Sequence, residues 1–82
     1  MTKKNKLYEK IRNAPENVRF EEICALAEMA GFTFKAARGS HKTYRHAGVV
    51  ELLNFQDDGG KAKPYQVRQL LKIIESYRLE VK

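Results

Sequence analysis

Residues 32–56 read FTFKAARGSHKTYRHAGVVELLNFQ, and they contain three runs typical of β-strands, which predict a sheet at the centre of the chain. From Phe32 onward, side chains are expected to alternate between the two sides of an extended backbone. Phe32, Phe34 and Ala36 therefore share one predicted face of a first strand.

The rest of this stretch alternates between turn residues and strand-like runs. In chain order it predicts a turn at Gly39-Ser40, a second strand over residues 41–46, a turn at Ala47-Gly48 and a third strand over residues 49–56. Because each connection is short, the three strands are predicted to form an antiparallel meander.

Apolar residues at helical spacing flank these strands on both sides. The helix before them is expected to end at Gly31. Its apolar stripe consists of Phe20, Ile23, Cys24, Ala27 and Ala30. The helix after them begins at Pro64 and has its own stripe: Val67, Leu70, Leu71, Ile74 and Tyr77. A short amphipathic helix over residues 4–13 is predicted to end before Pro15.

The predicted order of elements defines the fold class. A helix, three strands and a helix predict a two-layer α+β domain, in which both helices cover one face of the sheet and leave the other face open. A chain of 82 residues has room for one domain, so we expect a single domain over residues 1–82, with residues 1–14 as an N-terminal helical extension.

Positive charge is concentrated in the second part of the chain. The net charge is +6, and residues 35–45 contain four basic residues and no acidic one. Such a field attracts polyanions such as nucleic acid, although a solvated basic face is the alternative interpretation.

Other features argue against several classes of protein. Cys24 is the only cysteine, so no intramolecular disulfide can form, and we interpret it as a small core residue. No apolar run is long enough to span a membrane, and residues 1–10 lack the apolar stretch of a secretory signal, so a cytoplasmic location is expected. Two histidines with one cysteine do not make a zinc site, and residues 57–60 lack the pattern of a calcium loop, so neither metal nor cofactor is expected.

The remaining candidate chemistry is acid–base catalysis by His41 beside a basic patch. A histidine titrates near neutral pH and can accept the proton of a ribose 2′-hydroxyl, which then attacks the adjacent phosphate. Lys and Arg side chains would stabilise the developing charge. From the residues alone, a phosphate-contacting histidine without catalytic function remains an alternative.

The stretch GSHKTYRH, together with the later KAKPYQVRQLLKIIESYRL, resembles the HicA-type toxins over about Val18 to Leu79. The resemblance implies a double-stranded-RNA-binding-domain-like fold and metal-independent cleavage of mRNA with His41 as the catalytic histidine. Gly39 and Ser40 match the turn of that family, and GKAK from Gly60 resembles its basic loop. The resemblance also implies a HicB-type antitoxin as partner.

Two positions depart from the family pattern. The family often has a second histidine where this chain has Lys42, and commonly a proline where this chain has Ala47. Because Lys42 keeps a cation for phosphate, we expect activity to be retained. The residues predicted to bind RNA are Gly39, Ser40, Lys42, Arg45, Lys61 and Lys63.

Strand alternation separates the two histidines. In a regular strand His41 shares a face with Thr43 and Arg45, whereas His46 lies on the other face with Tyr44, so His46 is expected to be structural. The group that protonates the leaving oxygen stays open, with Lys61, Lys63 or Tyr65 as candidates. Two other functions are kept as alternatives: a non-catalytic RNA-binding module that uses the same basic surface, and an interaction protein that docks an acidic partner.

Overall fold

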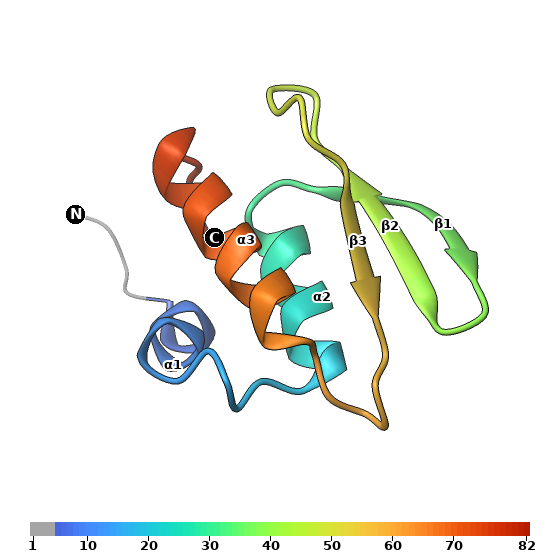
Figure 1. Ribbon diagram of the computed structural model, residues 1–82. Helices are drawn as coiled ribbons and strands as arrows, with labels where there is room; N and C mark the ends of the chain where they lie inside the picture. The colour runs from blue at the N-terminus through green and yellow to red at the C-terminus, as the bar shows by residue number, and fades with distance from the viewer. Residues whose placement is uncertain (1–4) are drawn as a thin grey trace.

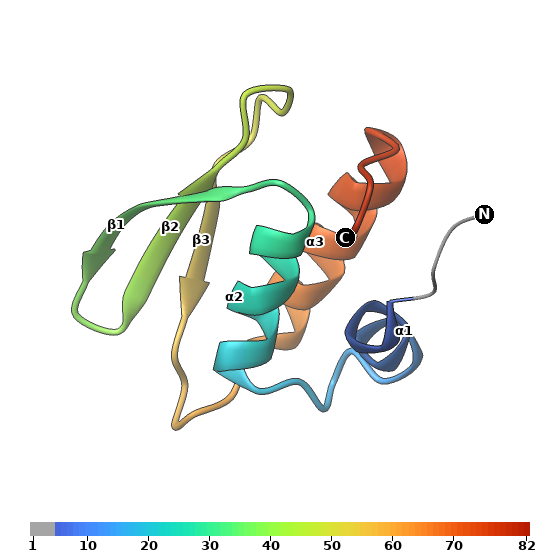
Figure 2. The ribbon, with the colours of Figure 1, turned by 180° about the vertical axis from the view of Figure 1, so that it is seen from behind.

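The computed structural model describes residues 5–82. Its elements are, in chain order, α1 (Lys6–Asn13), α2 (Phe20–Met29), β1 (Thr33–Arg38), β2 (His41–Arg45), β3 (Leu53–Gln56) and α3 (Pro64–Ser76). The strands pair antiparallel in the order β1-β2-β3. Figures 1 and 2 show α2 and α3 on one face of the sheet, while no helix of the described residues covers the other face. The predicted two-layer α+β fold is confirmed.

Strand β1 does not keep the alternation that the sequence predicts. Phe34 lies opposite Tyr44 and Ala36 lies opposite Thr43, so the register shifts by one residue at Lys35. Such a bulge turns the side chains that follow it to the other face of the sheet. The prediction that Phe34 and Ala36 share a face is therefore wrong, and Ala36 lies on the open face with Thr43.

Strand β3 begins four residues later than predicted. Val49 is not part of the strand. Its side chain is buried in the core, and its N–H donates a hydrogen bond to the carbonyl of His46 at 3.1 Å. Val50 and Leu52 are exposed. Residues 46–52 therefore form a loop, visible in Figure 1 between the end of β2 and the start of β3, and Val49 packs from this loop into the core.

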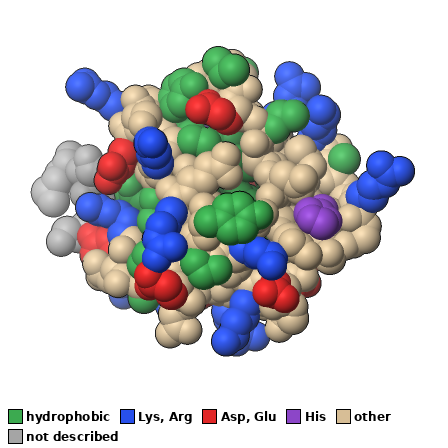
Figure 3. All heavy atoms as spheres, viewed as in Figure 1, with side chains coloured by type: hydrophobic (Ala, Val, Ile, Leu, Met, Phe, Trp, Pro, Cys, Tyr) green, Lys and Arg blue, Asp and Glu red, His purple; other side chains and the backbone are tan. Residues whose placement is uncertain are grey.

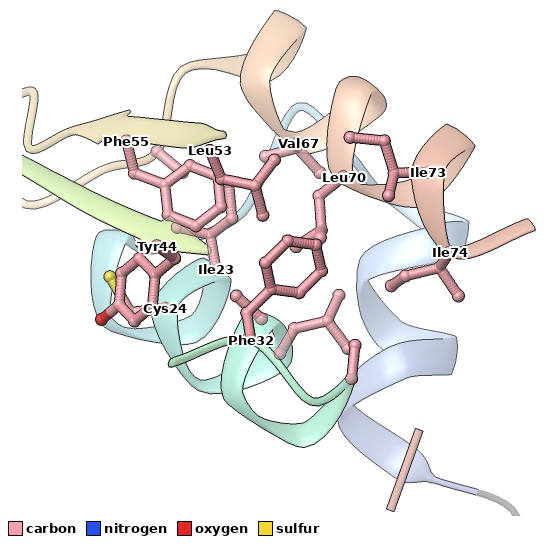
Figure 4. Packing of buried hydrophobic residues seen from close by; sticks show 14 of the residues in the cluster. Ile23, Cys24, Phe32, Tyr44, Leu53, Phe55, Val67, Leu70, Ile73 and Ile74 are labelled. Atoms are coloured by element: carbon pink, nitrogen blue, oxygen red, sulfur yellow. The ribbon is translucent and has the colours of Figure 1, made fainter. Parts of the chain in front are cut away.

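The core lies between the sheet and the two covering helices (Figure 4). From the sheet, Tyr44 of β2 and Leu53 and Phe55 of β3 point toward the helices. The buried helix residues are Ile23, Cys24, Leu26 and Ala27 of α2 and Gln66, Val67, Leu70, Ile73 and Ile74 of α3. The stripe predicted for α3 is confirmed except at Leu71, which is half-buried, and at Tyr77, which is exposed.

Helix α1 is part of the packed structure. Ile11 has no exposed surface and belongs to the core cluster, and Leu7 packs against that cluster. The Lys10 ammonium is hydrogen-bonded to the Glu22 carboxylate of α2, and this bond, followed by the backbone N–H of Arg19, lowers the pKa of Glu22. The predicted helix over residues 4–13 is confirmed from Lys6 onward, whereas residues 1–4 of the predicted extension lie outside the described residues.

The turn after α2 leads to the first prediction. Gly31 has φ +98°, a conformation that L side chains rarely adopt, and a Cβ there would lie 3.0 Å from Nε2 of His46. We expect Gly31→Ala to lower the free energy of unfolding by roughly 1–2 kcal/mol from the backbone conformation alone. Urea denaturation of both proteins measures this, and an unchanged midpoint would contradict it.

Within residues 5–82, no helix combines the length and the apolar character that crossing a membrane requires.

Candidate functional site

A tight turn places His41 at the start of β2. Gly39 has φ +58° at the first central position of a two-residue hairpin loop, where a type II′ turn requires a positive φ. The loop puts Arg38 and His41 directly opposite each other as the last pair of the β1–β2 ladder. The Ser40 carbonyl accepts a hydrogen bond from the N–H of Asp57 at 2.8 Å, so the turn is also tied to the end of β3.

A hollow of about 310 Å³ lies at His41 on the open side of the sheet. Its lining comes from all three strands: Ala36, Ala37, Arg38, His41, Thr43 and Asn54. The small side chain of Ala36 reaches this face because of the bulge at Lys35. His41 is half-buried and lines the hollow, so part of its surface remains accessible.

Arg38 was missing from the residues predicted as a site, although the sequence contained the signal for it. A two-residue loop at Gly39-Ser40 pairs the residues on either side of it, which are Arg38 and His41. Arg38 is exposed and lines the same hollow as His41. A guanidinium beside the histidine is well suited to hold a phosphate.

The structure separates the predicted cations into different places. Lys42 lies on the side of the sheet that faces the helices, with Nζ 5.6 Å from the centre of the Phe20 ring, and thus on the opposite face from His41. Arg45 has the same strand parity as His41 but ends β2, opposite Thr33. Neither residue lines the hollow.

Lys61 and Lys63 lie on the loop that connects β3 to α3. The backbone of Lys61 is bonded to that of Asp58 in both directions and forms a bridge with Arg19, which fixes the loop against the start of α2. Lys63 Nζ lies 3.7 Å from a carboxylate oxygen of Asp58. The Asp57 carboxylate accepts from the N–H of Gly60 at 2.7 Å and closes the turn.

His46 has a structural environment, as predicted. Its Nδ1 accepts a hydrogen bond from the N–H of Gly48 at 2.8 Å, and its ring lies edge-on to Phe32 at 5.1 Å between centroids. It follows β2 at the end opposite His41.

Tyr44 points into the core, as predicted, and its hydroxyl lies beside the sulfur of Cys24 (Figure 4). Burial, followed by hydrogen bonding with Cys24, raises the pKa of Tyr44. Burial is also the main cause that raises the pKa of the Cys24 thiol. Neither group is ionised near neutral pH, which agrees with a core role for Cys24.

Charged side chains of both signs are dispersed over the face of the molecule seen in Figure 3. Figure 3 shows Lys and Arg side chains around the visible face, with acidic side chains between them. Among residues 5–82, no three His, Cys, Asp or Glu side chains gather as a metal site would require.

The element order and the uncovered sheet face define a small α+β domain of the double-stranded-RNA-binding type. The family model described as HicA toxin of bacterial toxin-antitoxin matches residues 20–75, about two-thirds of the chain. The chain therefore belongs to the HicA toxin family, as its resemblance indicated. Searches of curated proteins and of solved structures found no match.

The matched segment runs from the start of α2 nearly to the end of α3 and includes every residue that lines the hollow. Helix α1 lies before it. Membership places the protein with the toxins of toxin–antitoxin systems, and such a system implies an antitoxin partner.

Proposed function

We propose that the protein is a metal-independent endoribonuclease that cleaves mRNA with His41 as its single catalytic histidine, and that a HicB-type antitoxin neutralises it by covering the open sheet face. The observation that carries this proposal is the pairing of His41 with Arg38 at the edge of an uncovered hollow, in a chain of the HicA toxin family.

The proposed reaction is an attack within the RNA chain. His41 accepts the proton of a ribose 2′-hydroxyl, and the oxygen attacks the adjacent phosphorus while the bond to the 5′ oxygen breaks. The products are a 2′,3′-cyclic phosphate and a free 5′-hydroxyl, whose oxygen takes a proton from a second group. Arg38 lies where it can stabilise the negative charge that develops on phosphate.

The predicted cations serve the rest of the RNA chain in this proposal. Gly39 and Ser40 shape the turn that presents His41, and Arg45 binds phosphate at the other end of the open face. Lys42, Lys61 and Lys63 lie off this face, so we propose that they contact phosphates where the RNA leaves it. All four of these side chains would contact the RNA backbone, so they would not distinguish one RNA sequence from another.

The test of the reaction is cleavage by purified protein with and without EDTA. We expect RNA to be cut equally in both conditions, because the proposed chemistry uses side chains alone. DNA of the same sequence should remain intact, because it lacks the 2′-hydroxyl. Loss of cleavage in EDTA, or equal cutting of DNA, would reject the mechanism. RNA binding without cleavage would favour the non-catalytic RNA-binding module.

The phosphate contacts lead to a separate prediction. Replacing Lys42, Arg45, Lys61 or Lys63 singly by alanine should weaken RNA binding for all sequences alike and reduce the magnitude of the slope of log K against log salt by about one. Lys72→Ala is the matched control, because Lys72 is exposed on α3 and is not among the proposed contacts. A variant that changes sequence preference at an unchanged slope would remove that residue from this role.

A further inference from the structure

Tyr65 is the most exposed aromatic residue in the described part of the chain, with 65% of its surface accessible. It is the second residue of α3, directly after Pro64. Among residues 5–82, no other ring and no cation stacks on the Tyr65 ring. The other tyrosines are engaged: Tyr8 under Arg12, Tyr44 in the core, and Tyr77 through its hydroxyl to Glu51.

A buried glutamine next to Tyr65 connects this ring to the sheet. Gln66 is 6% exposed and is the one buried polar residue among those described. Its Oε1 accepts a hydrogen bond from the N–H of Gln56 at 2.9 Å, and its Nε2 donates to the hydroxyl of Tyr65 at 3.4 Å. The same side chain therefore contacts both Tyr65 and the end of β3.

The end of β3 is the neighbour of His41. Gln56 lies directly opposite His41 in the β2–β3 ladder, and the N–H of Asp57 donates to the carbonyl of Ser40. Tyr65 is thus connected to His41 by three successive contacts, through Gln66 and Gln56. His41 is the first residue of β2 and Gln56 is the last residue of β3, and Figure 1 shows these two strand ends side by side.

We propose that Tyr65 is a base-stacking residue that holds an unpaired base of the RNA whose phosphate lies at His41. This inference rests on the proposed RNA-cleaving function and extends it, because it makes single-stranded RNA the substrate class. Exposed aromatic rings beside the path of the RNA backbone are the groups on which proteins stack unpaired bases. Stacking uses the face of the base, so it tolerates different sequences.

Stacking can be distinguished from proton donation, the other role open to Tyr65. A stacking residue needs its ring, whereas an acid needs its hydroxyl. Tyr65→Phe should therefore keep RNA affinity and cleavage rate near those of the parent if the ring stacks. Tyr65→Ala should lose affinity by a factor between about five and about a hundred, the range for removal of one stacked base.

The experiment measures the affinity of the full chain for single-stranded RNA in a His41→Ala background, so that the RNA is not cut. A series of oligonucleotides each carries one abasic nucleotide at a successive position. We expect one position at which loss of the base weakens binding as much as Tyr65→Ala does. In the protein that also carries Tyr65→Ala, the same abasic position should cost nothing further, because the two partners of one interaction are not additive.

Tyr77→Ala is the matched control, because it removes an exposed tyrosine from the other end of α3 and should leave RNA affinity unchanged. Unchanged affinity in Tyr65→Ala, or a loss in Tyr65→Phe equal to that in Tyr65→Ala, would overturn the stacking role while leaving the cleavage proposal intact. If the parent neither binds nor cuts any RNA, the proposed function itself fails, and the stacking role with it.

Discussion

Replacing His41 by alanine is expected to lower the rate of RNA cleavage by about 10²- to 10⁴-fold, the contribution typical of a positioned proton-transfer group. The fold should be unaffected, because His41 is only half-buried at the edge of the hollow and is not part of the core cluster. RNA affinity should largely persist, because Arg38 and the other cations remain. Single-turnover cleavage, RNA affinity and thermal midpoint measure the three properties separately, and growth arrest on expression should be lost.

His46→Ala is the matched control for this prediction. It removes the acceptor of the Gly48 N–H and the contact with Phe32, so it should act mainly through stability, by about 1–2 kcal/mol, with the cleavage rate of the folded protein preserved. A His41→Ala protein that cuts RNA at nearly the parent rate would exclude the catalytic role of His41 and favour the non-catalytic RNA-binding module.

The second large effect is expected at Ile11 in α1, outside the segment that matches the HicA family. Ile11→Ala should lower the free energy of unfolding by about 2–5 kcal/mol, because Ile11 has no exposed surface and its removal leaves a cavity. A small domain has about 5–15 kcal/mol in total, so much of the stability would be lost. Denaturant unfolding of both proteins measures this change in the free energy of unfolding, and the m-value should be the same in the two.

Leu52→Ala is the control for Ile11, because it shortens an aliphatic side chain of the same size that is 52% exposed in the β2–β3 loop. We expect a change within about 0.5 kcal/mol there. If Ile11→Ala were as mild as Leu52→Ala, α1 would be a dispensable appendage of the domain. A large effect would support the proposal that the described residues fold as one unit.

The helices and the order of strands followed from the sequence because their signals are local. Pro64 begins α3, Gly31 forms the turn after α2, and Gly39-Ser40 forms the turn of the first hairpin, each for reasons of backbone conformation. The opposite faces of His41 and Tyr44 followed from the alternation of a strand that stays regular. The structural role expected for His46 agrees with its contacts.

The bulge at Lys35 and the loop before β3 were not predictable in this way. The loop depends on which apolar side chain enters the core: Val49 is buried and Val50 is not, although the two are identical and adjacent. The bulge changes which residues of β1 line the hollow, and so it decides that Ala36 does.

The class of fold, the position of His41 at the start of a strand and the membership of the HicA family could be read from the sequence, because turn residues, periodicity and motif lie within short stretches of chain. Which cations share a surface with His41 depends on how the chain folds. The tertiary structure places Arg38 beside His41 and Lys42 over Phe20 on the opposite face, and it links Tyr65 to the site through Gln66. The physical reason is that side-chain neighbours across a sheet depend on register and on helix packing, which join residues far apart in the chain.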